Sequence, residues 1–340
     1  MLKPRFETDP LEDPGSFRRA LAAWFRNHGR DYPWRRTRDP YAILVSEVML
    51  QQTQIATVLG RGFYTRFLER FPDTATLAAA EDDALLKAWE GLGYYRRARM
   101  LREAARTVED EHGGRFPDDF EAILALPGVG RYTAGAVWSF AFGKPAPIVD
   151  GNVARVLSRL LDSADPIDAG PTMKRLWEVA GELLDAADPR THNSALMELG
   201  QSHCRPGVPD CLGCPAGKFC RCPEPAALPV KAKRVKATAV DEDLVFLRRG
   251  DRVLMRKLEE GRREGMWRLP EGGGVGEPVY QGKYGITRYR VTMRVRPAEK
   301  GRRAKSGEAW CELDELGKLV IPPADRKALR ALLQDSEEIA

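Results

Sequence analysis

The stretch Leu126-Pro127-Gly128-Val129-Gly130-Arg131-Tyr132-Thr133-Ala134-Gly135-Ala136 decides the fold of this chain. Gly128 and Gly130 bracket a tight turn, and the small and apolar residues that follow predict a helix over 132–142. Such a turn presents backbone N–H groups at a helix N-terminus, which is an anion-binding arrangement. A phosphate held there would position a nucleic-acid duplex without reading its bases. We therefore predict DNA contacts from Leu126, Gly128, Val129 and Gly130; an ordinary Pro-Gly turn is the alternative.

Composition sets the outer limits. The chain has 340 residues, which is enough for more than one domain, and 43% of them are hydrophobic, as in a globular protein. The 54 basic and 49 acidic residues give a net charge of +5, which suits an anionic partner but does not by itself predict one. The N-terminus has no apolar signal core, and no run approaches the roughly 18 apolar residues of a membrane span. We expect a cytoplasmic, nucleoid-associated protein with no membrane partner.

The chain changes character near residue 222. Up to that point the patterns are helical, and 223–240 form a basic, proline-containing connector. Beyond it, strand patterns and a closing helix predict a smaller α+β domain over 241–340. The predicted helices cover 40–55, 57–70, 81–90, 95–111, 117–124, 132–142, 153–161, 171–184, 191–201 and 325–333, and the predicted strands cover 244–248, 252–256 and 288–295. The fold class is thus multidomain, with an all-α domain over 1–222 followed by the α+β domain.

Four thiols lie in one short segment, at Cys204, Cys211, Cys214 and Cys220. Four cysteines this close can wrap one metal centre, either zinc or a [4Fe–4S] cluster. The uneven spacing of six, two and five residues favours the cluster, and zinc is the alternative. Cys222 is a fifth thiol that we expect to be a spectator.

Two carboxyl groups, those of Glu47 and Asp150, are candidates for a general acid and a stabilising anion. Glu47 lies in the apolar stripe of its predicted helix with Ile43 and Leu50, where desolvation raises the pKa of a carboxyl group. Asp150 directly precedes a helix, so its simplest role is an N-cap. Cleavage of a glycosidic bond requires one carboxylic acid at the leaving group and one carboxylate near the sugar. Glu47 and Asp150 fit those two roles, with a core residue and a plain helix cap as the alternatives.

The turn, its following Asp and the cysteine segment resemble the helix-hairpin-helix DNA glycosylase superfamily of endonuclease III. The motifs that further resemble the adenine DNA glycosylases of the MutY family are WR (34–35), SEVMLQQT (46–53), WEGLGYY (89–95) and VDGN (149–152). The resemblance covers roughly 15–222 with long motifs and the remainder more weakly. It implies a [4Fe–4S] cluster and a monomer that acts on double-stranded DNA with adenine opposite 8-oxoguanine or guanine.

The resemblance also assigns roles. It implies that Glu47 protonates adenine N7 and handles water, that Asp150 stabilises the sugar cation, and that Tyr132 and Asn152 support the site. Adenine must leave the base stack, which is easier at a mispair. The resemblance implies DNA contacts for Arg35, Gln51, Gln52, Thr53, Leu92 and Tyr94, of which Tyr94 is the best candidate for an aromatic wedge. Plain packing or a solvated helix face is the alternative for these residues.

One position separates two activities within the superfamily. Relatives that also cut the strand carry a lysine after the hairpin, whose amine forms a Schiff base with the sugar. This chain has Tyr132 there, so we expect a monofunctional glycosylase that leaves an abasic site. The rival functions are an endonuclease III-like bifunctional enzyme for oxidised pyrimidines and a DNA-binding protein without catalysis.

The C-terminal region resembles the MutT-like module of the same family, which recognises 8-oxoguanine, through the segment GMWRLPE (265–271). The long glutamate-rich box of nudix hydrolases does not follow it, so pyrophosphate hydrolysis is not expected. The lesion-sensing loop matches at Thr287, but Arg288 replaces the family's histidine. Ser194 likewise replaces a Gln or Glu expected in the adenine pocket.

Overall fold

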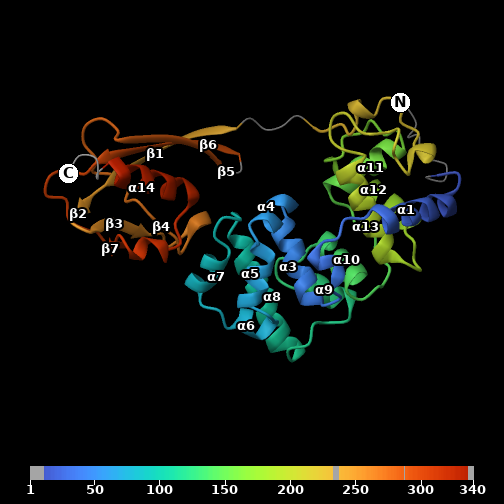
Figure 1. The fold of residues 1–340 in the computed structure, drawn as a ribbon, viewed down its shortest axis with the longest axis horizontal. Helices are drawn as coiled ribbons and strands as arrows, with labels where there is room; N and C mark the ends of the chain where they lie inside the picture. Colours follow the sequence, from blue (N-terminus) through green and yellow to red (C-terminus); the bar gives the residue numbers. More distant parts are fainter. Residues whose placement is uncertain (1–10, 233–236, 287, 336–340) are drawn as a thin grey trace. The chain divides into compact units, whose positions relative to one another are not determined.

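The computed structural model describes residues 11–232, 237–286 and 288–335. Its contacts divide the chain into two compact units. Unit 1 comprises residues 1–52 and 103–234, and unit 2 comprises 53–102 and 235–340 (Figure 1). The division falls inside α8 (Arg96–His112). The helices of 53–102 therefore group with the C-terminal α+β region.

Unit 1 is helical, as the sequence predicts for this part of the chain. Its helices begin where the chain offers capping residues; Asp150, for example, caps α11 and Asp188 caps α13. Besides the second part of α8, its elements are α1 (Pro14–His28), α2 (Pro33–Arg36), α3 (Pro40–Leu50), α9 (Phe120–Ala125), α10 (Arg131–Phe140), α11 (Gly151–Leu160), α12 (Gly170–Leu183), α13 (Pro189–Ser202) and the 3₁₀ turns η1 (Gly217–Phe219) and η2 (Pro225–Ala227).

Two predicted helices are shorter than expected. The prediction that one helix runs from Pro40 to about residue 55 is wrong at its end, because α3 stops at Leu50 and Gln52 takes a left-handed φ of 57°. The predicted helix over 57–70 is in fact α4 (Ile55–Gly60) and α5 (Phe63–Arg70). Gly62, at φ 62°, separates them, since a left-handed residue cannot continue a helix.

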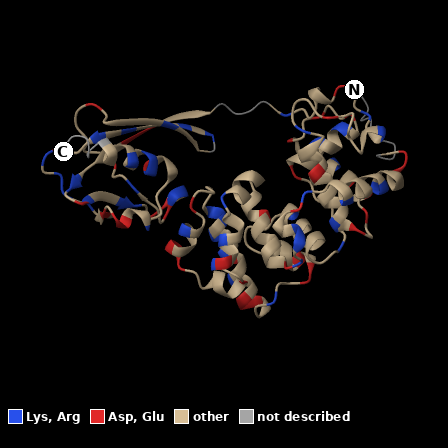
Figure 2. Ribbon diagram, viewed as in Figure 1, with Lys and Arg blue, Asp and Glu red and all other residues tan. Residues whose placement is uncertain are grey.

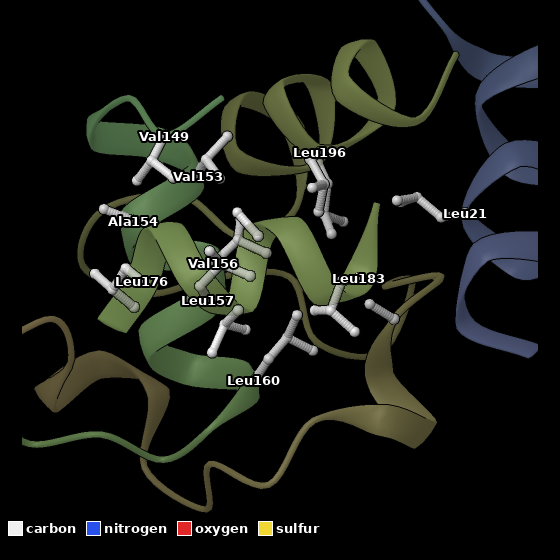
Figure 3. Packing of buried hydrophobic residues seen from close by; sticks show 14 of the residues in the cluster. Leu21, Val149, Val153, Ala154, Val156, Leu157, Leu160, Leu176, Leu183 and Leu196 are labelled. Atoms are coloured by element: carbon white, nitrogen blue, oxygen red, sulfur yellow. The ribbon is translucent and has the colours of Figure 1, made fainter. Parts of the chain in front are cut away.

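The core of unit 1 lies where α1, α11, α12 and α13 meet. Leu157 and Leu183 are fully buried there, and Figure 3 shows their side chains among leucines and valines of the neighbouring helices. α11 packs against both α12 and α13, and α13 also packs against α1. This core fixes the N-terminus of α11, and with it the position of Asp150.

Truncating this core provides a stability prediction. Leu157→Ala should lower the free energy of unfolding by about 2–5 kcal/mol, because it removes buried methyl groups and leaves a cavity. Urea denaturation followed by circular dichroism measures the change. Leu212→Ala is the matched control, since Leu212 is fully exposed and its truncation should change stability by less than about 0.5 kcal/mol. Equal losses in the two variants would contradict the described core.

Unit 2 joins short helices to two small sheets. One sheet has the order β1-β6-β5, with β1 parallel and β5 antiparallel to β6; in the other, β3 pairs with β2, β4 and β7. Besides the start of α8, its helices are α4, α5, α6 (Thr74–Ala78), α7 (Asp82–Ala88), α14 (Pro323–Asp335), η3 (Gly261–Arg263) and η4 (Glu315–Gly317). Its strands are β1 (Thr238–Phe246), β2 (Arg248–Arg249), β3 (Arg252–Lys257), β4 (Trp267–Arg268), β5 (Tyr280–Ile286), β6 (Tyr289–Pro297) and β7 (Glu308–Glu312).

The C-terminal region has its own core. Leu244, Val253, Met293 and Leu329 belong to one buried cluster, and α14 packs against β5 beside the β1-β6-β5 sheet (Figure 1). The predicted α+β region is therefore confirmed. Among the described helices, none is both long and apolar enough to span a membrane.

Candidate active site

Glu47 is held inside unit 1 by α3. Asp39 caps this helix through the backbone N–H groups of Tyr41 and Ala42, and α3 packs against α10. Residues 41–49 of α3 are all buried, and Glu47 is only 4% exposed. The helix thus carries a carboxyl group into an apolar interior, as the sequence predicts.

The surroundings of Glu47 change its ionisation. The pKa of its carboxyl group is raised to about 7, chiefly by burial and also by the negative charge of Asp150. A hydrogen bond with Tyr132 and the charge of Arg35 act in the opposite direction. Glu47 is therefore able to hold a proton near neutral pH and also to release it, which is what a general acid and base requires.

Tyr132 stands in the first turn of α10, directly after the glycine turn. Its hydroxyl group shares a hydrogen bond with Glu47 and lies 4.0 Å from Met197 Sδ. Burial raises the pKa of the phenol well above its usual value, so Tyr132 is a neutral hydrogen-bonding group and offers no amine nucleophile.

Asp150 is the N-cap of α11. Its Oδ1 accepts from the backbone N–H groups of Asn152 at 2.9 Å and Val153 at 2.7 Å, and its Oδ2 accepts from Asn152 Nδ2 at 2.9 Å. The predicted cap is thus confirmed. These bonds fix the orientation of a carboxylate that lies close enough to Glu47 to influence its pKa.

Arg155 holds Asn152, which in turn donates a hydrogen bond to Asp150. Its Nη2 donates to Asn152 Oδ1 at 2.9 Å and to the Gly200 carbonyl at 2.7 Å, and its Nε donates to the Cys204 carbonyl at 2.8 Å. The orientation of Asn152 is therefore tied both to α13 and to the start of the cysteine segment. Sequence reasoning did not single out Arg155.

Arg35 has a buried partner that sequence reasoning also missed. Arg35 Nη1 donates to Glu198 Oε2 at 2.9 Å, and its guanidinium lies over the rings of Phe25 and Tyr32. Glu198 is 1% exposed and also pairs with Arg30 at 3.4 Å. The signal was present, because Glu198 interrupts the apolar side of α13 much as Glu47 interrupts α3. Arg35 thereby brings a positive charge to the site at Glu47.

The glycine turn has the predicted geometry. The backbone N–H of Val129 donates to the Leu126 carbonyl at 3.0 Å, Gly128 has a left-handed φ of 77°, and Gly130 caps α10. The side chains of Leu126 and Val129 are buried, so contact with a ligand falls to the backbone of the turn. Ser194 is buried on α13.

The cysteine segment packs on the core of unit 1 through Cys204, Cys214 and Cys220. As described, these and the neighbouring acidic or His side chains do not form a group that could hold a metal ion. The buried guanidinium of Arg159 donates to Cys204 Sγ at 3.3 Å, as well as to backbone carbonyls. Arg159 thus places a positive charge against the sulfur of Cys204.

The predicted DNA contacts at the ends of α3 and α7 fall in both units. In unit 1, Gln51 is the C-cap residue of α3 and Gln52 is exposed. In unit 2, Thr53 Oγ1 accepts from Arg97 Nη2 at 3.2 Å, Tyr94 is 45% exposed and Leu92 is buried. Leu92 therefore packs in the interior in this structure. Thr287 lies outside the described residues, whereas the exposed Arg288 covers the ring of Tyr289.

Charge is distributed rather than concentrated. Segments with Lys or Arg and segments with Asp or Glu are scattered over the ribbons of both units (Figure 2). The surplus of +5 is small, so the local arrangement of the turn and the two carboxyl groups is more informative than the total charge.

This combination of a glycine turn before a helix, a buried acid and a capped aspartate defines a class of DNA repair protein. Residues 45–182 match the family described as HhH-GPD superfamily base excision DNA repair protein. The solved structure of a thermostable thymine-DNA glycosylase is 33% identical, with a TM-score of 0.56, over 62% of this chain and 96% of that one. A trapped covalent intermediate of endonuclease III with DNA is 26% identical, with a TM-score of 0.52, over 61% and 95%. The chain therefore contains an HhH-GPD domain over residues 45–182.

Within that superfamily, curated relatives are adenine DNA glycosylases. The human adenine DNA glycosylase is 46% identical over 216 residues, which cover 61% of this chain and 39% of the human protein. The chain thus spans about two fifths of the length of this relative.

Proposed function

We propose that this protein is an adenine DNA glycosylase that removes adenine mispaired with 8-oxoguanine or guanine in double-stranded DNA. The observation that carries the proposal is the buried Glu47, with a pKa of about 7, beside the capped Asp150. A matched acid and anion are what hydrolysis of an N-glycosidic bond requires. The identity to adenine DNA glycosylases supports adenine as the base.

The reaction balances with these residues alone. Adenine leaves the stack, and Glu47 transfers its proton to adenine N7. The bond between the sugar C1′ and adenine N9 then breaks, with its electron pair going to the base, and Asp150 stabilises the oxocarbenium ion that remains. Water adds to C1′ and gives its proton to the Glu47 carboxylate. Tyr132 and Asn152 hold the two carboxyl groups in place through the hydrogen bonds described above.

Tyr132 supports a monofunctional enzyme. A lyase step needs an amine that attacks C1′ and forms a Schiff base, and a phenol cannot do so. The product would be an abasic site in an intact strand. Alkali would then be needed to break the strand.

The remaining parts of the proposal concern binding. The backbone of the glycine turn would hold a DNA phosphate, and Arg35, Gln51, Gln52, Thr53 and Tyr94 would contact the duplex around the extruded base. The α+β region would serve as a MutT-like module that recognises 8-oxoguanine. We further propose a monomer that works in the cytoplasm on nucleoid DNA.

The cysteine segment would hold a [4Fe–4S] cluster through Cys204, Cys211, Cys214 and Cys220. The guanidinium of Arg159, which donates to Cys204 Sγ, fits the anionic charge of such a ligand set. A cluster would supply electron-transfer capacity and would brace the loop. Visible absorbance and metal analysis distinguish it from zinc.

Base release should depend on pH through Glu47. Since the protonated carboxyl group is the active form, the single-turnover rate should be constant below the pKa and fall about tenfold per pH unit above about pH 7. The raised pKa also means that the contribution of Glu47 to stability is complete below its unfolded pKa and is lost as pH rises through about 7. Rates measured from pH 5 to 9 test this, and a rate that rises with pH would contradict it.

The first experiment uses duplexes with adenine opposite 8-oxoguanine, guanine or thymine, resolved with and without alkali. We expect strand cleavage after alkali, for the two mispairs and not for the thymine pair. Cleavage without alkali, together with a borohydride-trapped complex, would replace this proposal with a bifunctional glycosylase. Tight binding without base release from any duplex would indicate a non-catalytic DNA-binding protein.

A further inference from the structure

Within unit 2, a charged seam joins α7 and α8 to the C-terminal region. Lys257 Nζ lies 3.1 Å from Asp83 Oδ1. Arg99 Nη2 donates to the Glu264 carbonyl at 2.6 Å and to Asp82 at 2.9 Å. Acids on α7 thus meet a base from β3, while a base from α8 meets a backbone carbonyl after η3. Lys257 and Asp83 thus form an ion pair between the two regions, and Arg99 adds a hydrogen bond between them.

The seam ends at Glu90, two residues beyond α7. Arg326 of α14 reaches Glu90 Oε1 from Nε at 3.1 Å and also through Nη2. Lys87 donates to Glu90 Oε2 at 2.7 Å and to the carbonyl of Gly317 at 2.6 Å. The Glu90 and Arg326 side chains are only 18% and 23% exposed, so solvent screens this pair less than an open surface pair.

Glu90 is also the second residue of the loop over 89–95, which joins α7 to α8 and carries Tyr94. Gly91, Gly93 and Tyr94 all have positive φ values, of 103°, 71° and 49°. A tyrosine in the left-handed region is strained, and it persists only where neighbours hold it. Arg97 provides part of that support, because its guanidinium lies 5.4 Å from the Tyr94 ring and donates to the carbonyls of Leu92 and Gly93. The loop therefore presents an exposed aromatic ring in a fixed, costly conformation.

We propose that the Glu90–Arg326 ion pair is a specificity-determining joint, through which the C-terminal region positions the Tyr94 loop for mispair recognition. The inference rests on the proposed glycosylase function. Glu90 and Arg326 act as positioning residues: Arg326 belongs to α14, and Glu90 lies in the loop four residues before Tyr94. The C-terminal region would contact the base opposite adenine, and the ion pair would couple that contact to insertion of Tyr94 into the DNA base stack.

Two readouts on the full-length protein test the joint. The first is hydrogen exchange without DNA, in which Glu90→Gln and Arg326→Gln should each speed exchange of the amides over 90–95. The second is the ratio of single-turnover rates on adenine opposite 8-oxoguanine and opposite guanine. Each single variant should lower this ratio by about fivefold, the size expected for losing one partly buried ion pair. The double variant should be no worse than either single one, and Arg326→Lys should retain most of the ratio.

Epistasis with the loop separates positioning from general destabilisation. In a Tyr94→Ala background, Glu90→Gln should leave the rate ratio unchanged, because the residue it positions is already gone. Lys318→Gln is the matched control, since Lys318 forms an exposed pair with Glu315 at 2.6 Å in the same region. Its exchange and rate ratio should equal those of the wild type.

Wild-type exchange and selectivity in both single variants, or additive losses with Tyr94→Ala, would overturn the joint. Failure of the proposed function would instead appear as no adenine release by the wild type.

Discussion

Glu47→Gln should abolish adenine release while leaving mispair binding nearly intact. Glutamine has the shape of glutamate and can keep the hydrogen bond with Tyr132, but it has no proton to give to adenine N7. Loss of a general acid that also handles water should lower the single-turnover rate by roughly 10³-fold or more. Rates on the 8-oxoguanine mispair, with affinity from fluorescence anisotropy, measure both effects.

The matched control for this variant is Glu308→Gln. Glu308 is also a buried glutamate, paired with Arg302 at 2.9 Å in the C-terminal region. Its substitution tests whether removing any buried carboxylate stops the reaction, and we expect base release to remain close to that of the wild type. A Glu47→Gln enzyme that still releases adenine at a rate near the wild type would exclude Glu47 as the acid.

Asp150→Asn should have an effect of similar size for a different reason. Asparagine is also a good N-cap, and its carbonyl oxygen can accept the bonds that the Asn152 and Val153 amides donate to Oδ1. What disappears is the negative charge that faces the sugar cation. We expect a loss of roughly 10²–10³-fold in the single-turnover rate, in the range measured when an electrostatic stabiliser is removed.

Stability measurements separate the charge from the cap. Asp119→Asn is the matched substitution, because Asp119 caps α9 by accepting from the Ala122 amide at 2.9 Å. Both variants should unfold within about 1 kcal/mol of the wild type, whereas only Asp150→Asn should lose base release. If Asp150→Asn unfolds the helical unit, the comparison with Asp119→Asn will reveal it.

Local features of this chain could be predicted from sequence. The turn at Gly128, the cap at Asp150 and the burial of Glu47 each depend on residues that are neighbours along the chain or on one helix face. The raised pKa of Glu47 follows from the same local argument, because an acid within an apolar stripe loses its hydration.

Features that depend on tertiary contacts were missed. The pairing of Arg35 with Glu198 joins residues far apart in sequence and forms only when α13 packs in the core. Leu92, for which the resemblance implies a DNA contact, is buried in this structure. The strands β2 and β4 span two residues each and are too short to leave a periodic pattern. The parallel pairing of β1 with β6 likewise depends on long-range register.

The hydrogen bonds that start α11 have a consequence for how freely this site can change. Asp150 Oδ1 accepts from two backbone N–H groups of its own helix, and Oδ2 accepts from the Asn152 side chain. In the proposed reaction the carboxylate would therefore need little reorganisation when positive charge develops on the sugar. Asp150 therefore has two roles, because it caps the N-terminus of α11 and also carries the negative charge. Among the common helix-capping residues, aspartate alone meets both, which leaves this position little room for redesign. A change in the negative charge at this position would therefore require a new N-terminal cap for α11.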